Sequence, residues 1–318
     1  MKNPLLTISL TIVLFGLSFT MHSQTHEFVS EKIHCTYETN EGRIQGKYIS
    51  YYANGVKKAE GNFENNYRSG KWKVWDSTGV LRIQRVYRNP FEFYILMPDE
   101  KEEHPIDLLA PPIYTLQYNS DNYLEDFTID ASMVIWAKRI WRWIPMENNV
   151  LLFDNNYLFT TLNKNVLNGN LTAYNSVNDL FNKELNIATI DTSHQKIIGF
   201  KIKEDHFFDN KRFVSEKRIL GICPVAVNII SQDTTDLYWV RFPATRKYLA
   251  TASITQQESY KSLDDLFFFR NFYSSIYKED NIYNRQISDY KSGSDISKEA
   301  EKIEINLIET EHDIWLSM

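Results

Sequence analysis

A repeat with a period of 24 residues lies near the start of the chain and narrows the range of possible folds. Residues 46–51 (Gly-Lys-Tyr-Ile-Ser-Tyr) recur as residues 70–75 (Gly-Lys-Trp-Lys-Val-Trp), and Gly55 recurs as Gly79. Asn54-Gly55 is a strong hairpin signal, because both residues accept a positive φ. Aromatic residues at alternating positions would share one face of the strands. The repeat therefore predicts an antiparallel β-hairpin module over residues 25–97.

The pattern Gly-Lys-Tyr/Trp-x-x-Tyr/Trp, followed by Asn-Gly-x-x-Lys and Gly-x-Phe, resembles the MORN-type repeat in its bacterial variant form over residues 42–90. About two units are visible, fewer than a freestanding solenoid needs. We therefore expect the module to pack against the following domain or against a partner. The resemblance implies contact with a protein or a surface, with Tyr51 and Trp75 as candidate contact residues. A plain structural meander is the alternative.

Residues 1–24 have the layout of a secretory signal peptide, with Lys2, an apolar stretch from Leu5 to Phe19, and a polar exit. A transmembrane anchor is the alternative, but the stretch is shorter than the roughly 20 apolar residues that span a bilayer. No cysteine stands at the expected cleavage point near Ser23 or Gln24, so a lipid anchor is not expected. These features predict an exported, soluble protein.

The composition excludes several classes of protein. Aromatic residues make up 14% of the chain and its formal net charge is −6, whereas disordered chains have few aromatic residues and a high net charge. The acidic balance argues against a nucleic-acid partner. The two cysteines, Cys35 and Cys223, could pair in an oxidising compartment, although nothing local supports a disulfide.

Four of the nine prolines and a run of acidic residues fall within residues 98–112. Because proline disfavours helix at its own position and at the one before it, residues 98–127 are expected to form an exposed linker. Residues 128–318 would then form a second domain.

The segment from Asp130 to Ile144 is expected to be a helix, because its apolar residues are spaced +3, +4, +3. One interpretation is an amphipathic helix packed on a core. The other is a partner-binding surface, since Trp and Arg are favoured at interface hot spots. The candidate partner-binding residues on that surface are Lys138, Arg139, Trp141 and Arg142.

The remaining pattern predicts an α+β domain. Helices are expected over residues 157–168, after a Ser262 cap with a face that extends to Ile276, and from about Ser294 onwards. Strands are expected over residues 197–203, 213–230 and 237–251.

No catalytic, cofactor-binding or metal-binding motif emerges from the sequence. Residues 204–206 (Glu-Asp-His) and 311–313 (Glu-His-Asp), and the pair Asp191 and His194, lack the spacing of metal ligands. Cys223 lies in an apolar run typical of a buried small residue. We expect a non-enzyme without a cofactor, a metal or a small-molecule substrate. A hydrolase that unites His194, His206 or His312 with an acid is the enzymatic alternative.

Several stretches after the predicted linker together resemble the GldN/PorN family of gliding-motility and type IX secretion proteins. Their order and spacing extend over about residues 128–316. The stretches are residues 135–142 (Ile-Trp-Ala-Lys-Arg-Ile-Trp-Arg), 167–174 (Leu-Asn-Gly-Asn-Leu-Thr-Ala-Tyr), 202–209 (Ile-Lys-Glu-Asp-His-Phe-Phe-Asp) with 218–224 (Arg-Ile-Leu-Gly-Ile-Cys-Pro), and 262–267 (Ser-Leu-Asp-Asp-Leu-Phe) with 275–281 and 311–315.

The resemblance implies a non-enzymatic periplasmic subunit that is peripherally associated with the outer membrane. In that family the protein assembles with a GldK/PorK-type lipoprotein into a ring and contacts the periplasmic part of a GldM/PorM-type motor protein. Residues 143–147 (Trp-Ile-Pro-Met-Glu) depart from the family pattern, and the hairpin repeat is not a core family feature. A second hypothesis is therefore a divergent paralogue that serves as a soluble cell-envelope adaptor and binds a protein through its repeats.

Overall fold

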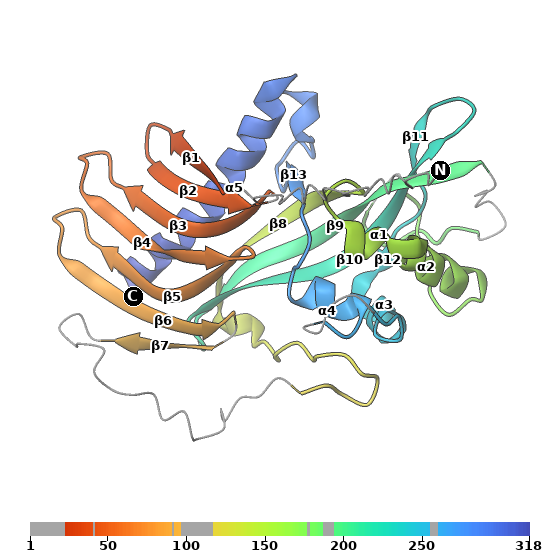
Figure 1. The fold of residues 1–318 in the computed structure, drawn as a ribbon, viewed down its shortest axis with the longest axis horizontal. Coiled ribbons are helices and arrows are strands. Elements are labelled where there is room, and N and C mark those ends of the chain that lie inside the picture. Colours follow the sequence, from red (N-terminus) through yellow and green to blue (C-terminus); the bar gives the residue numbers. More distant parts are fainter. Residues whose placement is uncertain are drawn as a thin grey trace, which may run out of the picture.

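The computed structural model describes residues 23–40, 42–90, 92–96, 117–176, 179–186, 194–254 and 260–318. Of the predicted signal peptide, only Ser23 and Gln24 lie within the described residues. The first part of the predicted linker, residues 98–116, lies outside them. Two β-sheets make up most of the fold, and Figure 1 shows them side by side with a long C-terminal helix running behind the first. The N-terminal antiparallel sheet and the mixed region after it confirm the predicted α+β class.

The first sheet is an antiparallel meander in which seven strands follow one another in chain order. The repeat sets its register, because Gly46 lies opposite Phe63 and Gly70 lies opposite Tyr87 one unit later. Its strands are β1 (Gln24–Val29), β2 (His34–Asn40), β3 (Arg43–Tyr51), β4 (Lys57–Glu64), β5 (Tyr67–Trp75), β6 (Leu81–Asn89) and β7 (Glu92–Leu96). The predicted hairpins are therefore present, and they are compatible with a MORN-type repeat.

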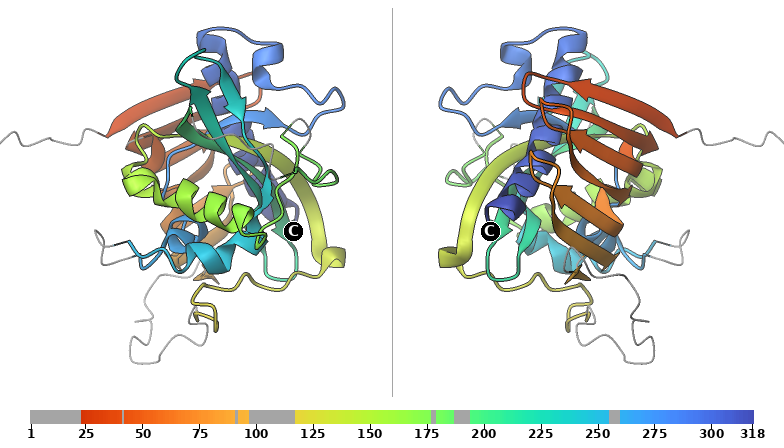
Figure 2. Two further views of the ribbon diagram at one scale, coloured as in Figure 1. Left: turned by 90° about the vertical axis from the view of Figure 1, so that its right-hand side faces the viewer. Right: turned by 90° about the vertical axis from the view of Figure 1, so that its left-hand side faces the viewer.

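Three aromatic residues of the repeat gather on one face of the first sheet. Tyr48, Phe63 and Trp72 pack there with Ile305 and Ile308 of α5 (Ser294–Ser317). Figure 2 shows α5 lying along this sheet in both side views. The hairpins thus bury their apolar face against the C-terminal helix, as their small number predicts.

The second sheet has the strand order β11-β10-β9-β8-β13, with β12 also paired to β10. Long hairpin strands dominate it, because β9 and β10 pair over most of their length. Its strands are β8 (Val134–Pro145), β9 (Gln195–Asp209), β10 (Val214–Asn228), β11 (Thr234–Asp236), β12 (Val240–Arg241) and β13 (Ser275–Glu279).

Helices pack on two parts of the same face of the second sheet. Helices α1, α2, α3 and α4 cover the part that holds Ile144 and Phe200. Helix α5 covers the part that holds Ile140 and packs there through Ile303. The other helical segments are η1 (Ala131–Met133), α1 (Val150–Phe153), η2 (Asp154–Asn156), α2 (Tyr157–Leu167), α3 (Phe242–Leu249), α4 (Leu263–Phe268) and η4 (Ile287–Asp289).

The predicted helix over residues 130–144 is wrong, because this segment forms strand β8. Asp130 does cap a helical turn, accepting a hydrogen bond from Ser132 N at 3.0 Å, but that turn is only the short η1. After it, β-branched and aromatic residues pair along β9, with Ile140 opposite Glu204. Pairing with a long neighbouring strand overrides the helical spacing of the apolar residues.

Two further predictions need correction. The strand expected over residues 237–251 is only the two-residue β12, because Pro243 starts helix α3 directly after it. The helix capped by Ser262 begins as predicted, with a reciprocal capping box to Asp265, but it ends at Phe268. Ile276, expected on the same helix, lies on β13. Helices α2 and α5 and strands β9 and β10 confirm the other predicted elements.

Candidate functional site

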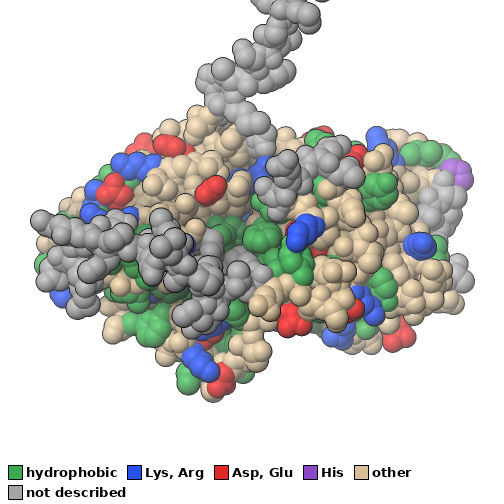
Figure 3. All heavy atoms as spheres, turned by 60° about the horizontal axis from the view of Figure 1, so that its bottom comes forward, with side chains coloured by type: hydrophobic (Ala, Val, Ile, Leu, Met, Phe, Trp, Pro, Cys, Tyr) green, Lys and Arg blue, Asp and Glu red, His purple; other side chains and the backbone are tan. Residues whose placement is uncertain are grey.

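A groove of about 740 Å³ lies between the two sheets, beside α5. We call it the inter-sheet groove. Figure 3 looks at the face that carries β7 and α4, where apolar side chains gather near the middle. The groove is lined by residues of the first sheet and its turns (Ile44, Phe63, Asn66, Tyr67, Arg68, Tyr87, Pro90, Phe93), of the second sheet and its loops (Asp126, Phe127, Trp136, His206, Arg212, Val214, Ser215, Glu216, Lys217, Arg218, Ile219), and of the helices and the turn after α4 (Phe242, Pro243, Arg246, Phe267, Phe268, Arg270, Glu304, Leu307, Ile308, Glu311).

A buried charge cluster forms the wall of the groove where β8, β9 and α5 meet. Glu204 is fully buried and accepts a hydrogen bond from Arg142 Nε at 2.6 Å, and it also pairs with Arg270. His206 Nε2 lies 2.6 Å from the same carboxylate. Arg142 reaches α5 through Glu304, at 2.7 Å. The cluster therefore connects the second sheet to α5 through ions that are withdrawn from water.

The charges in this cluster alter the pKa of each member. Burial raises the pKa of Glu204, but Arg270 and Arg142 outweigh it and hold the pKa well below its usual range. Burial also raises the pKa of Glu304, but Arg142 and Lys217 outweigh it and lower this pKa to about 2. Burial lowers the pKa of His206 to about 4 despite the neighbouring Glu204. At neutral pH the carboxylates are thus ionised and the histidine is neutral.

Lys217 stands apart within the groove. Burial lowers its pKa to about 8, with Glu304 opposing that change. Its Nζ lies 3.9 Å from Glu304, and the side chain keeps 28% of its exposure. A distance of 3.9 Å is beyond hydrogen-bond reach, so the donors of this ammonium are not used by Glu304.

A second buried network joins the repeat module to α5. The Tyr48 hydroxyl donates to Glu309 at 2.7 Å, and Lys58 Nζ lies 2.9 Å from the same carboxylate. His312 Nδ1 lies 3.0 Å from Glu309, and Arg68 pairs with Glu311. The last turns of α5 are therefore fixed on the first sheet by directional contacts as well as by apolar packing.

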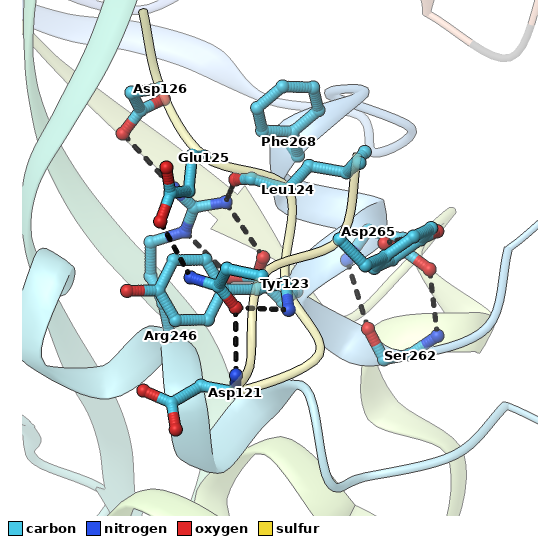
Figure 4. A network of polar contacts seen from close by, with 12 residues as sticks. Asp121, Tyr123, Leu124, Glu125, Asp126, Arg246, Ser262, Asp265 and Phe268 are labelled. Atoms are coloured by element: carbon cyan, nitrogen blue, oxygen red, sulfur yellow. Dashed lines mark hydrogen bonds and ion pairs between the residues drawn. The ribbon is translucent and has the colours of Figure 1, made fainter. Parts of the chain in front are cut away.

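Arg246 of α3 fixes the chain that enters the second sheet (Figure 4). Its guanidinium donates to Asp264 of α4 at 2.9 and 3.0 Å and to Asp126 at 3.0 Å, and it also donates to the Leu124 carbonyl. It stacks over Tyr123, with 4.5 Å between the guanidinium carbon and the ring centroid. This single side chain therefore shapes the rim of the groove next to Phe268.

The residues predicted to bind a partner have different environments. Trp141 and Arg142 are buried, at 5% exposure each, because they lie on β8 inside the second sheet. Lys138 and Arg139 are half-buried and pair with Glu279 and Asp205.

Tyr51 and Trp75 are half-buried at the ends of β3 and β5. The Tyr51 ring lies 5.3 Å from that of His34, and Lys57 Nζ lies 5.3 Å above the Trp75 ring. The structure brings these two aromatic residues to the turns of the first sheet, away from β8. Sequence reasoning missed Lys217, Arg246 and Arg270, because their neighbours come from distant parts of the chain.

Two histidines of the enzymatic alternative are buried, each beside a carboxylate. His206 belongs to the Glu204 cluster, and His312 belongs to the Glu309 network. Asp191, expected near His194, lies outside the described residues. Within the described residues, no group of three or more His, Cys, Asp or Glu side chains could hold a metal ion.

Cys35 and Cys223 are both free and buried, in separate apolar clusters. Burial raises the pKa of Cys35 to about 12 and that of Cys223 well above its usual range. Neither thiol has the thiolate character that a nucleophile needs.

None of the helices in the described ranges is long and apolar enough to cross a membrane.

Comparison with known proteins assigns the second sheet and its helices to a family. A search of curated proteins finds no match to the chain. The family model described as "Gliding motility associated protein GldN" matches residues 129–316, which include β8 to β13 and nearly all of α5. This match extends over more than half of the chain, so the protein belongs to the GldN family of cell-envelope components of gliding motility and type IX secretion.

Proposed function

We propose that this protein is a non-enzymatic periplasmic subunit of the type IX secretion and gliding motility apparatus, exported by its signal peptide. It assembles with a GldK/PorK-type lipoprotein into a ring or scaffold at the outer membrane and contacts the periplasmic part of a GldM/PorM-type motor protein. The observation that carries this proposal is the family match over residues 129–316. The apolar clusters and the two ion networks support it, because they join both sheets to α5 in one packed body that can serve as a subunit of an assembly.

The partner contacts proposed on β8 are made by Lys138 and Arg139, whose side chains keep 35% and 40% of their exposure. Successive strand residues point to opposite faces, so these two residues serve different contacts. Trp141 and Arg142 act indirectly, since they hold β8 in the sheet.

The test is isolation of the tagged protein, expressed at its native level, from detergent-solubilised envelopes. We expect co-purification of the lipoprotein and the motor component. A clean deletion is expected to abolish secretion of type IX cargo and gliding. Normal secretion and gliding in that strain, with no paralogue present, would contradict the proposal.

A second candidate function is an adaptor that binds a protein through the first sheet. The observation favouring it is that β1 to β7 precede the family match and still share a core with α5. Removing residues 25–97 would uncover Ile305 and Ile308, so point variants are the better test. Loss of one interaction in Tyr51→Ala and Trp75→Ala, with secretion intact, would favour the adaptor.

A further inference from the structure

The inter-sheet groove has the size and walls of a binding site that the family match does not assign. Its volume of about 740 Å³ lies within the range of roughly 300–1,000 Å³ typical of ligand sites. Tyr67 and Tyr87 line it from the first sheet, Trp136 from the second, Phe127 from the segment before β8, and Leu307 from α5. Aromatic side chains and arginines are the residues that dominate binding energy at protein interfaces.

Among the described residues that line the groove, basic side chains outnumber acidic ones, although the protein as a whole is acidic. Six basic and four acidic side chains line it, in a chain whose formal net charge is −6. Five of the six bases have a carboxylate within 3.0 Å. The sixth is Lys217, whose Nζ lies 3.9 Å from Glu304. Among the described residues that line the groove, Lys217 is therefore the cation available to meet an incoming anion.

We propose that the inter-sheet groove binds an extended segment of a partner subunit that places a large apolar side chain among these rings and an Asp or Glu carboxylate on Lys217. This inference rests on the proposed function, because the partner is a subunit of the same apparatus. The contact depends on the first sheet as well as on the family region, since neither forms the groove alone.

The walls favour a peptide over a lipid chain. An acyl chain needs a continuous apolar wall, whereas charged side chains interrupt the rings here, with Arg68 and Glu311 on one side and Arg218 and Glu216 on the other. A peptide carries amide donors and acceptors that can meet such paired ions. Lys217 can also form a charge-assisted hydrogen bond to a carboxylate of the segment.

The first test uses a photo-crosslinking amino acid in place of Phe127, a lining residue that is 38% exposed. The full-length protein is irradiated in living cells, and the crosslinked peptides are identified by mass spectrometry. We expect a crosslink to one segment of another subunit that contains an acidic residue beside a large apolar one. A crosslink only to this chain or to lipid, or none at all, would overturn the inference.

The second test measures the affinity of a synthetic peptide of that segment for the full-length protein. Lys217→Met is expected to weaken binding by roughly tenfold or more, as for a hydrogen bond between charged groups. The peptide with Asn or Gln in place of its acid should bind wild type equally weakly and lose nothing further with Lys217→Met. The matched control is Lys298→Met, whose side chain is 73% exposed on α5.

The outcomes separate the two proposals. If the wild-type complex with the lipoprotein forms but Lys217→Met binds the peptide as tightly as Lys298→Met does, the groove inference fails and the proposed function stands. If no subunit of the apparatus co-purifies with the wild-type protein, the proposed function fails first.

Discussion

Trp72 occupies the centre of the face that the first sheet turns toward α5. Its side chain is fully buried, with ring centroids 5.0 Å from Phe63 and 5.5 Å from His312, and Arg68 lies 4.9 Å above it. We expect Trp72→Ala to lower the free energy of unfolding by about 3–5 kcal/mol, because it removes a large buried ring and leaves a cavity. Urea unfolding followed by circular dichroism measures this change.

Trp75 provides the matched control for that prediction. It ends the same repeated block but is only half-buried, beside Lys57. Trp75→Ala should therefore cost less stability, since less of its ring leaves water on folding and its removal leaves no enclosed cavity. Equal losses for the two variants would contradict the assignment of Trp72 to the core and of Trp75 to the surface.

His206 makes the stability of the fold depend on pH. Burial lowers its pKa to about 4, whereas an unfolded histidine titrates near 6.5. Between these values the unfolded chain binds the proton and the folded chain does not, so stability is present above about pH 6.5 and is lost as the pH falls toward 4. This titration changes the free energy of unfolding by at most about 3 kcal/mol between neutral pH and pH below 4.

Unfolding free energies at pH 7 and pH 4 test this linkage. We expect the difference between the two to shrink in His206→Gln, because glutamine cannot take up the proton. His34→Gln, on an exposed pair with Glu27, controls for the loss of a histidine as such. An unchanged difference in His206→Gln would show that other groups carry the acid sensitivity.

Two glycines of the β3–β5 hairpins are required for different physical reasons. Gly55 has a φ of +83° in the turn between β3 and β4, with open space around it. A Cβ at Gly61 would lie 2.2 Å from the indole of Trp72. We expect Gly61→Ala to cost about 1–3 kcal/mol through overpacking and Gly55→Ala about 1 kcal/mol through backbone strain. Urea unfolding of both variants measures these costs.

A double variant separates the two causes. In a Trp72→Ala background the indole is gone, so Gly61→Ala should lose most of its cost, whereas Gly55→Ala should keep its own. Additive losses for Gly61 and Trp72 would mean that the steric explanation is wrong.

Elements set by local interactions were predictable from the sequence, whereas elements set by tertiary pairing were not. The first sheet was predictable because Asn54-Gly55 and the 24-residue period act locally, and α5 because its apolar spacing is local too. Strand β8 was not, since its conformation comes from pairing with β9, more than fifty residues later in the chain. The groove was equally out of reach, because Tyr67, Lys217 and Leu307 meet only through tertiary packing.

At the scale of the whole molecule, α5 is the element on which both sheets depend. Its Ile305 and Ile308 pack with the first sheet, while Ile303 and Leu307 pack with Ile140 and Ile276 of the second. The helix therefore buries two faces at once, and each sheet would expose a part of its core without it. We therefore expect the repeat module and the family region to unfold as one unit.

This arrangement predicts that the two sheets lose stability together. Ile305→Asp puts a charge into the core of the first sheet, where Ile305 is 1% exposed. We expect hydrogen exchange, measured by mass spectrometry, to speed up by a similar factor in peptides from β3 and from β9, because global unfolding becomes the shared route of exchange. Lys298→Met, on the exposed side of the same helix, should leave both unchanged. Faster exchange confined to β1 to β7 would instead mean that the repeat module opens alone, and that the groove between the sheets is not a fixed feature of the fold.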